Sequence, residues 1–106
     1  MPSEILTVTT QDGPEASVIL RAAGEIDRDS RDDLRQVAGG AMSKGVHRLV
    51  LDVGAVTFCD SSGLSLFVDL HRQTRGEGGW LRLAAVPPYL REMLRVTRLD
   101  DLLEIV

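Results

Sequence analysis

Two polar segments hold the residues of this chain that could do chemistry. In FCDSSGLSLF, at residues 58–67, Asp60, Ser61 and Ser62 stand between two hydrophobic runs, and in GEID a further carboxylate, Asp27, follows another apolar run. Groups of carboxylates and hydroxyls can cap a helix, hold a divalent cation or take part in nucleophilic catalysis. Which of these roles applies depends on how the fold places the two segments.

Apolar patterns along the chain predict the elements that position these segments. Runs of β-branched and aliphatic residues between turn-forming stretches are typical of strands, whereas apolar residues at i, i+3, i+4 and i+7 indicate an amphipathic helix. Strands are predicted at residues 5–10, 17–24, 47–53 and 80–86. Helices are predicted from a cap at Ser30 to Gly45, from the DSSG segment to RGEGG, and after the proline pair PP, while residues 101–106 fit either a strand or a helix.

The order of these elements, β-β-α-β-α-β-α, predicts one α/β domain over residues 1–106. The first two strands form a hairpin, and the crossover helices make the rest of the mixed sheet mostly parallel. Because the carboxyl ends of parallel strands meet at one edge, Asp27 and Asp60 are predicted to approach each other there. Ser61 and Ser62 then start a helix whose first amide hydrogens are unpaired, so one hydroxyl can cap it while the other stays available. Gly63 allows another backbone to approach closely.

Composition narrows the class of partner. The chain has 106 residues, a net charge of −4 and only 4% aromatic residues, which disfavours nucleic-acid binding and favours a protein or small-molecule partner. Cys59 is the single cysteine, so no internal disulfide or cysteine-rich zinc site is expected. We expect no membrane segment and a cytoplasmic location, because no apolar run approaches ~20 residues and the N-terminus lacks a signal-peptide pattern. No cofactor is predicted, since the chain has no GxxxxGK[ST] loop to hold a nucleotide.

Nearly the whole chain resembles the STAS domain of bacterial anti-sigma factor antagonists. The resemblance rests on the GEID and FCDSSGL boxes, the glycine pair before WLRLAAV and the closing leucine-rich segment, all in the same order. It implies that Ser61 is phosphorylated by a partner that is both an anti-sigma factor and a serine kinase. The neighbouring positions that it assigns to the partner-binding surface are Asp27, Asp60, Ser62, Gly63 and Leu64.

The resemblance further implies a binding switch. The unphosphorylated protein binds the anti-sigma factor and frees a sigma factor, until the kinase, with its own ATP and magnesium, phosphorylates Ser61 and ends the interaction. A serine phosphatase resets the protein. The phosphate adds about 1.5 to 2 negative charges. The start of the helix favours this charge and Asp60 opposes it, so we expect the fold to survive and the partner-facing surface to change.

Three positions depart from the family pattern. Ser65 stands where many members have a second glycine, and Cys59 stands where methionine is common, and neither changes the predicted phosphoacceptor. Arg98 follows the third predicted helix at a position where many relatives carry glycine. If glycine forms a left-handed cap there, arginine is expected to strain or reshape the turn.

An enzyme is the first alternative that the residues leave open. Ser61 or Cys59 could serve as a nucleophile with His47 or His71 as the base. However, CDSSG differs from the GxSxG motif, and His71 follows Ser61 by about two and a half helical turns, too far for a hydrogen bond. Cys59 lies in an apolar run, where a buried thiol is more common than a reactive one. We therefore predict no catalytic residue.

A scaffold or sensor module is the second alternative. Such a module could bind a small anion, or a metal ion held by Asp27, Asp60 and Ser61. Two carboxylates without further oxygen ligands make a poor cation site, so we predict no metal. The arginines that could reach the same edge, and could recognise acids of a partner or the phosphate, are Arg21, Arg28 and Arg31.

Overall fold

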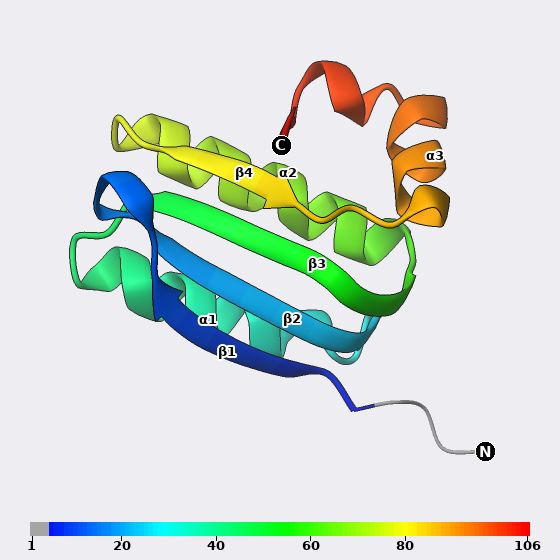
Figure 1. Cartoon of the computed structure of the whole chain (residues 1–106), viewed down its shortest axis with the longest axis horizontal. Helices are drawn as coiled ribbons and strands as arrows, with labels where there is room; N and C mark the ends of the chain where they lie inside the picture. Colours follow the sequence, from blue (N-terminus) through cyan, green and yellow to red (C-terminus); the bar gives the residue numbers. More distant parts are fainter. Residues whose placement is uncertain (1–4) are drawn as a thin grey trace.

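The computed structural model describes residues 5–106 as a single sheet with three α-helices and two short 3-10 helices (Figure 1). The strands are β1 (Thr7–Asp12), β2 (Val18–Ile26), β3 (Arg48–Cys59), β4 (Trp80–Ala84) and β5 (Glu104–Ile105). The helices are α1 (Arg31–Ser43), α2 (Ser61–Gly76) and α3 (Pro88–Val96), and the 3-10 helices are η1 (Pro14–Ala16) and η2 (Leu99–Asp101). Within residues 5–106 no helix is long and apolar enough to cross a membrane.

The strands lie in the order β1-β2-β3-β4-β5, so each strand neighbours the next one along the chain (Figure 1). β1 pairs antiparallel with β2 across a turn that contains η1, whereas β2, β3, β4 and β5 run parallel. The predicted α/β class, with an N-terminal hairpin and a mostly parallel sheet, is confirmed.

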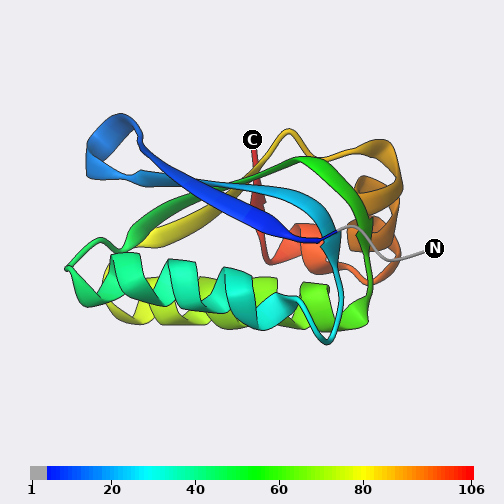
Figure 2. The same cartoon turned by 90° about the horizontal axis from the view of Figure 1, so that it is seen from below.

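Helices α1 and α2 lie together against one face of the sheet (Figure 2). A right-handed crossover joins β2 to β3 and another joins β3 to β4, and because both move in the same direction across the sheet, both helices fall on the same side. The core lies between these two layers, where side chains alternate into it along each strand. Its fully buried members include Leu20, Ile26, Leu34, Leu49, Leu51, Leu66, Phe67 and Leu70.

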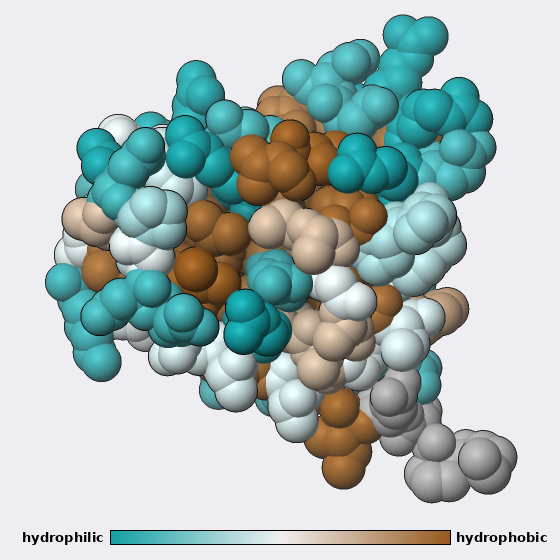
Figure 3. Space-filling view, viewed as in Figure 1, coloured by the Kyte–Doolittle hydropathy of each residue, from teal (hydrophilic) through white to brown (hydrophobic). Residues whose placement is uncertain are grey.

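The opposite face of the sheet is exposed and mixes polar with apolar side chains (Figure 3). On this face the Arg21 guanidinium pairs with the Asp52 carboxylate, with Nε 3.3 Å from Oδ2. Arg82 stacks 3.7 Å above the centre of the Trp80 ring and pairs with Glu104 at 2.6 Å. The Arg21 side chain is therefore paired in the middle of the sheet, and the expectation that it reaches the edge near Asp60 was wrong.

Several boundaries differ from those predicted. β3 continues to Cys59 instead of ending at residue 53, because its second half stays paired with β2 past two irregularities in register. β1 begins at Thr7 and not at residue 5, and β4 ends at Ala84 and not at residue 86. Residues 101–106, which fitted either a strand or a helix, contain the end of η2 and the two-residue strand β5 beside β4.

Arg98 links α3 to η2 in the left-handed conformation, with φ 61° and ψ 19°. A non-glycine residue in this region of backbone space costs on the order of 1 to 3 kcal/mol. The turn therefore keeps a geometry that suits glycine, and the arginine is strained there, as the sequence predicted.

Candidate functional site

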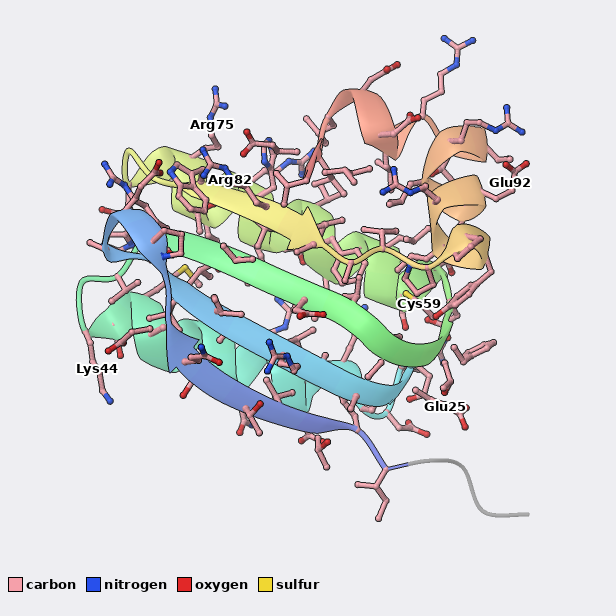
Figure 4. All side chains as sticks on the ribbon, in the orientation of Figure 1. Glu25, Lys44, Cys59, Arg75, Arg82 and Glu92 are labelled. Carbon is pink, nitrogen blue, oxygen red and sulfur yellow. The ribbon has the colours of Figure 1, made fainter. Side chains whose placement is uncertain are left out.

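The ends of β2 and β3 bring the two polar segments together. Ile26 and Cys59 are register partners at these ends, and the Asp60 N–H donates a hydrogen bond to the Ile26 carbonyl oxygen at 3.2 Å. Asp27 and Asp60 therefore follow two neighbouring strand ends at one edge of the sheet. Figure 4 shows Glu25 and Cys59, which precede them, at the same end of the molecule and away from Lys44.

Asp60 caps α2. Its Oδ1 accepts hydrogen bonds from the N–H groups of Ser62, at 2.9 Å, and Gly63, at 3.2 Å, and also from the Ser62 hydroxyl. The hydrogen bond from the Ser62 hydroxyl is the main cause that lowers the pKa of Asp60, and the two backbone N–H groups add to it. The prediction that one serine caps the helix was wrong in its choice of residue, because Ser62 donates to the capping carboxylate instead.

Ser61 is the first residue of α2 and its side chain is exposed. Among residues 5–106 no hydrogen bond to its hydroxyl is formed, in contrast to the hydroxyl of Ser62. The cap supplied by Asp60 explains this difference, because the helix start needs no side-chain acceptor from Ser61. The structure thus presents one free hydroxyl at the positive end of a helix.

Asp27 holds the entry to α1. Its Oδ1 accepts from the N–H groups of Asp29, at 3.0 Å, and Ser30, at 2.9 Å. The Ser30 hydroxyl donates to the Glu25 carbonyl oxygen at 2.7 Å and accepts from the Asp27 N–H at 3.0 Å. Ser30 occupies the predicted cap position, but its side chain braces the preceding turn and does not cap the helix.

Neither carboxylate belongs to a larger group of metal ligands. In the described part of the chain, no three His, Cys, Asp or Glu side chains lie close enough together to hold a metal ion. Asp27 and Asp60 instead accept backbone N–H groups at the starts of α1 and α2. Their positions are consistent with a role in shaping the two helix starts.

Gly63 and Leu64 lie beside the exposed serine but face inward. A Cβ atom added at Gly63 would lie 2.5 Å from the Cys59 Sγ and 2.8 Å from the Ile26 Cγ2, so the glycine lets side chains of β2 and β3 approach the helix. The predicted close approach is therefore made by side chains and not by another backbone. Leu64 is only 5% exposed and belongs to the core, so its side chain is not on the surface that a partner would meet.

Cys59 is a packing residue. Its thiol is buried against Gly63, and burial, with a smaller contribution from the Asp60 carboxylate, raises the pKa of Cys59 to about 12. A thiol with such a pKa is almost entirely protonated at neutral pH and is a poor nucleophile. His71 lies ten residues after Ser61 on α2, which corresponds to about 15 Å of helix. No catalytic pair involving Ser61 and His71 is assembled.

Arg31 is the arginine that reaches the site. It is the first residue of α1 and is half-buried, and its Nη1 lies 3.5 Å from the carbonyl oxygen of Ser62. Arg28 lies in the exposed turn between β2 and α1. The starts of α1 and α2 are thus close enough for a side chain of one to contact the main chain of the other.

Two aromatic side chains near this edge were missed by the sequence reasoning. Phe58 is 46% exposed and Tyr89 is 38% exposed, and the Tyr89 hydroxyl donates to the Val56 carbonyl oxygen at 2.6 Å. Successive side chains of a strand point to opposite sides, so Phe58 points away from the core that holds Cys59. This alternation was a usable signal, but it required knowing that β3 extends to Cys59.

Comparison with known proteins agrees with this geometry. The family model described as "Mlab, STAS domain" matches residues 9–104. The anti-sigma-B factor antagonist of Bacillus subtilis is 30% identical over 91 residues, which cover 86% of this chain and 83% of that protein.

Solved structures agree in fold. An anti-sigma factor antagonist from Mycobacterium paratuberculosis superposes with a TM-score of 0.83 at 26% identity, over 94% of this chain and 84% of that one. The phosphorylated form of the Bacillus cell fate determinant SpoIIAA superposes with a TM-score of 0.73 at 21% identity, over 94% of this chain and 91% of that one. With the family model matching residues 9–104, the chain belongs to the STAS domain family of bacterial anti-sigma factor antagonists.

Proposed function

We propose that this protein is an anti-sigma factor antagonist whose binding is switched by phosphorylation of Ser61. Unmodified, it binds an anti-sigma factor that is also a serine kinase, and a sigma factor is released. The observation that carries the proposal is the exposed Ser61 hydroxyl at the start of α2, without a hydrogen bond in the described residues. Similarity to anti-sigma factor antagonists supports the choice of partner.

The switching step is a phosphoryl transfer from ATP that the kinase holds with magnesium. The Ser61 oxygen forms a bond to the γ-phosphorus, the bond from that phosphorus to the bridging oxygen breaks, ADP leaves, and the serine proton passes to a base or to solvent. The chain is the substrate in this step and not the enzyme. A serine phosphatase would reverse the modification by hydrolysis. Because the kinase needs ATP, the proposed cycle would run in the cytoplasm.

The fold should tolerate the added phosphate. The start of α2 favours a negative charge by about 0.3 to 1 kcal/mol. The Asp60 carboxylate opposes it, because a charge pair at ~5 Å costs about 0.8 kcal/mol in water and about 3 kcal/mol at an effective dielectric constant near 20. Since Ser61 is exposed, the smaller cost applies and the two contributions nearly cancel. Phosphorylation should therefore change binding without unfolding the protein.

The phosphate should lie within the surface that the partner contacts. Phe58 and Tyr89 are exposed aromatic side chains near the site, and aromatic residues are enriched at the energetic centres of protein interfaces. The proposed partner surface includes these two side chains together with Ser61, three residues after Phe58 in the chain. Burying a phosphate under that partner requires removing its water, which is costly unless cations of the partner replace the water.

A phosphorylation assay tests the proposal. The protein would be incubated with its cognate kinase and ATP, and the modified residue identified by mass spectrometry of its peptides. We expect phosphate on Ser61, none in Ser61→Ala, and normal modification of Ser65→Ala, a matched exposed serine one turn further along α2. Phosphate on Ser62 with Ser61 unmodified would contradict the assignment.

The sensor alternative makes a different prediction. A module that holds a small anion or metal at Asp27, Asp60 and Ser61 should give a saturable heat of binding with magnesium, calcium or phosphate in calorimetry, and the proposal expects none of these to bind. Similarity to anti-sigma factor antagonists does not favour this alternative.

A further inference from the structure

Arg31 places a positive charge beside the first turn of α2, which begins with the exposed Ser61. It starts α1, yet its guanidinium extends to α2, where Nη1 lies 3.5 Å from the carbonyl oxygen of Ser62. Ser62 directly follows Ser61, so this side chain ends within one residue of the proposed phosphoacceptor. The side chain is half-buried, which limits the positions that the guanidinium can take.

Arg31 donates a hydrogen bond to the Ser62 carbonyl oxygen but forms no ion pair in the described structure. Within residues 5–106 no carboxylate forms an ion pair with it, whereas four other arginines are paired, namely Arg21, Arg35, Arg82 and Arg95. The nearby carboxylates of Asp27 and Asp60 accept backbone N–H groups instead. The position also works against α1, because a cation at the start of a helix is disfavoured by the helix dipole.

We propose that Arg31 is an internal phosphate-binding residue that pairs with the phosphate on Ser61. The inference rests on the proposed function, since it concerns the modified form of that serine. The planar guanidinium of arginine matches phosphate oxygens in a two-bond geometry, and pairing is stronger when the cation is partly buried. The protein itself would then offset the repulsion from Asp60 and hold the phosphate at the start of α2.

Titration of the phosphate tests this inference without a kinase. Phosphoserine would be incorporated at position 61 during translation, and the second pKa of the phosphate followed by phosphorus NMR. The second pKa of an unperturbed phosphoserine is about 6, and a neighbouring arginine lowers the pKa of an acid by roughly 1 unit or more. We expect Arg31→Gln to raise the phosphate pKa by about 1 unit relative to the parent phosphoprotein, and Arg31→Lys to raise it by less.

Two further variants separate contact from total charge. Arg75→Gln removes the same charge at the end of α2 far from Cys59 (Figure 4) and should leave the phosphate pKa unchanged. Arg28→Gln removes an exposed arginine from the turn before α1 and should have a smaller effect than Arg31→Gln. Thermal unfolding of each variant without phosphate should show no loss of stability relative to the parent protein, which excludes a folding defect as the cause.

The pairing would be overturned by equal phosphate pKa values in the parent protein and Arg31→Gln. It would also be overturned by equal shifts in Arg31→Gln and Arg28→Gln, because these would reflect overall charge. A kinase that fails to modify Ser61 would contradict the proposed function but would not change this titration. The two failures are therefore distinguishable.

Discussion

Gly63 is the position where a single methyl group should disturb the site most clearly. It lies in the first turn of α2, and a Cβ there would lie 2.5 Å from the Cys59 Sγ and 2.8 Å from the Ile26 Cγ2. Normal contacts between such atoms are about 3.5 to 4.0 Å. We therefore expect Gly63→Ala to force α2 away from the ends of β2 and β3.

The size of the effect follows from two opposing contributions. Overpacking a core contact costs about 1 to 3 kcal/mol, and the short distances at Gly63 favour the upper part of that range. Alanine is the better helix former by about 1 kcal/mol. The net expected destabilisation is about 1 to 2 kcal/mol, which lowers the melting temperature of a domain of this size by roughly 4 to 16 °C.

Urea unfolding of matched alanine variants measures this effect. Gly40→Ala in α1 is the control, because the added Cβ would meet no atom within 4 Å beyond its chain neighbours and the backbone of its own helix, and it should stabilise the protein by about 1 kcal/mol. Adding Cys59→Ala to Gly63→Ala should recover part of the loss, since the closest atom is then removed. Equal stabilisation by Gly63→Ala and Gly40→Ala would refute the packing described at the start of α2.

Three further substitutions test the cap, the strained turn and the partner surface. Asp60→Ala should cost about 1 kcal/mol at pH 7. The pKa of Asp60 is lowered in the folded protein, so its stabilising contribution is present above the unfolded pKa of 3.8 and is lost as the pH falls through the folded pKa. Urea unfolding between pH 7 and 2.5 should show the stability difference between the parent protein and Asp60→Ala shrinking, and a constant difference would contradict the cap. Arg98→Gly should raise the unfolding free energy by about 1 kcal/mol by relieving the positive φ, whereas Arg91→Gly inside α3 should lower it by a similar amount. A lower unfolding free energy in Arg98→Gly would show that the arginine is not strained. Phe58→Ala should weaken binding to the anti-sigma factor roughly tenfold or more with little change in melting temperature, and Val96→Ala on α3 serves as the exposed control. Unchanged affinity in Phe58→Ala would show that this side chain is not part of the interface.

The sequence was sufficient for the architecture because the apolar periods are clear. The runs around Leu20, Leu51 and Leu83 predict parallel strands, and the stripes on the two long helices predict crossovers, so the meeting of Asp27 with Asp60 at one edge could be inferred. The end of β3 could not be inferred from the sequence. Gly54 and Ala55 interrupt its apolar pattern, and the strand continues only because β2 supplies partners past two register irregularities.

Details of the site depended on this hidden boundary. Once β3 runs to Cys59, the cap position falls on Asp60 and not on a serine, and both residue types are good caps in isolation. The direction of the Arg31 side chain was also beyond the sequence, because it depends on how closely the starts of α1 and α2 lie in space. The resemblance in the FCDSSGL box singled out Ser61, and its role as phosphoacceptor stays a prediction. Within residues 5–106, the absence of a hydrogen bond to its hydroxyl follows from the cap that Asp60 provides.

The affinity of the protein for its anti-sigma factor, measured with Ser61 unmodified and phosphorylated, tests the switch most directly. Calorimetry on the two forms, with circular dichroism to show that both are folded, should give at least tenfold weaker binding for the phosphorylated form, or about 1.4 kcal/mol. Equal affinities of two folded forms would contradict a switch based on the charge at Ser61.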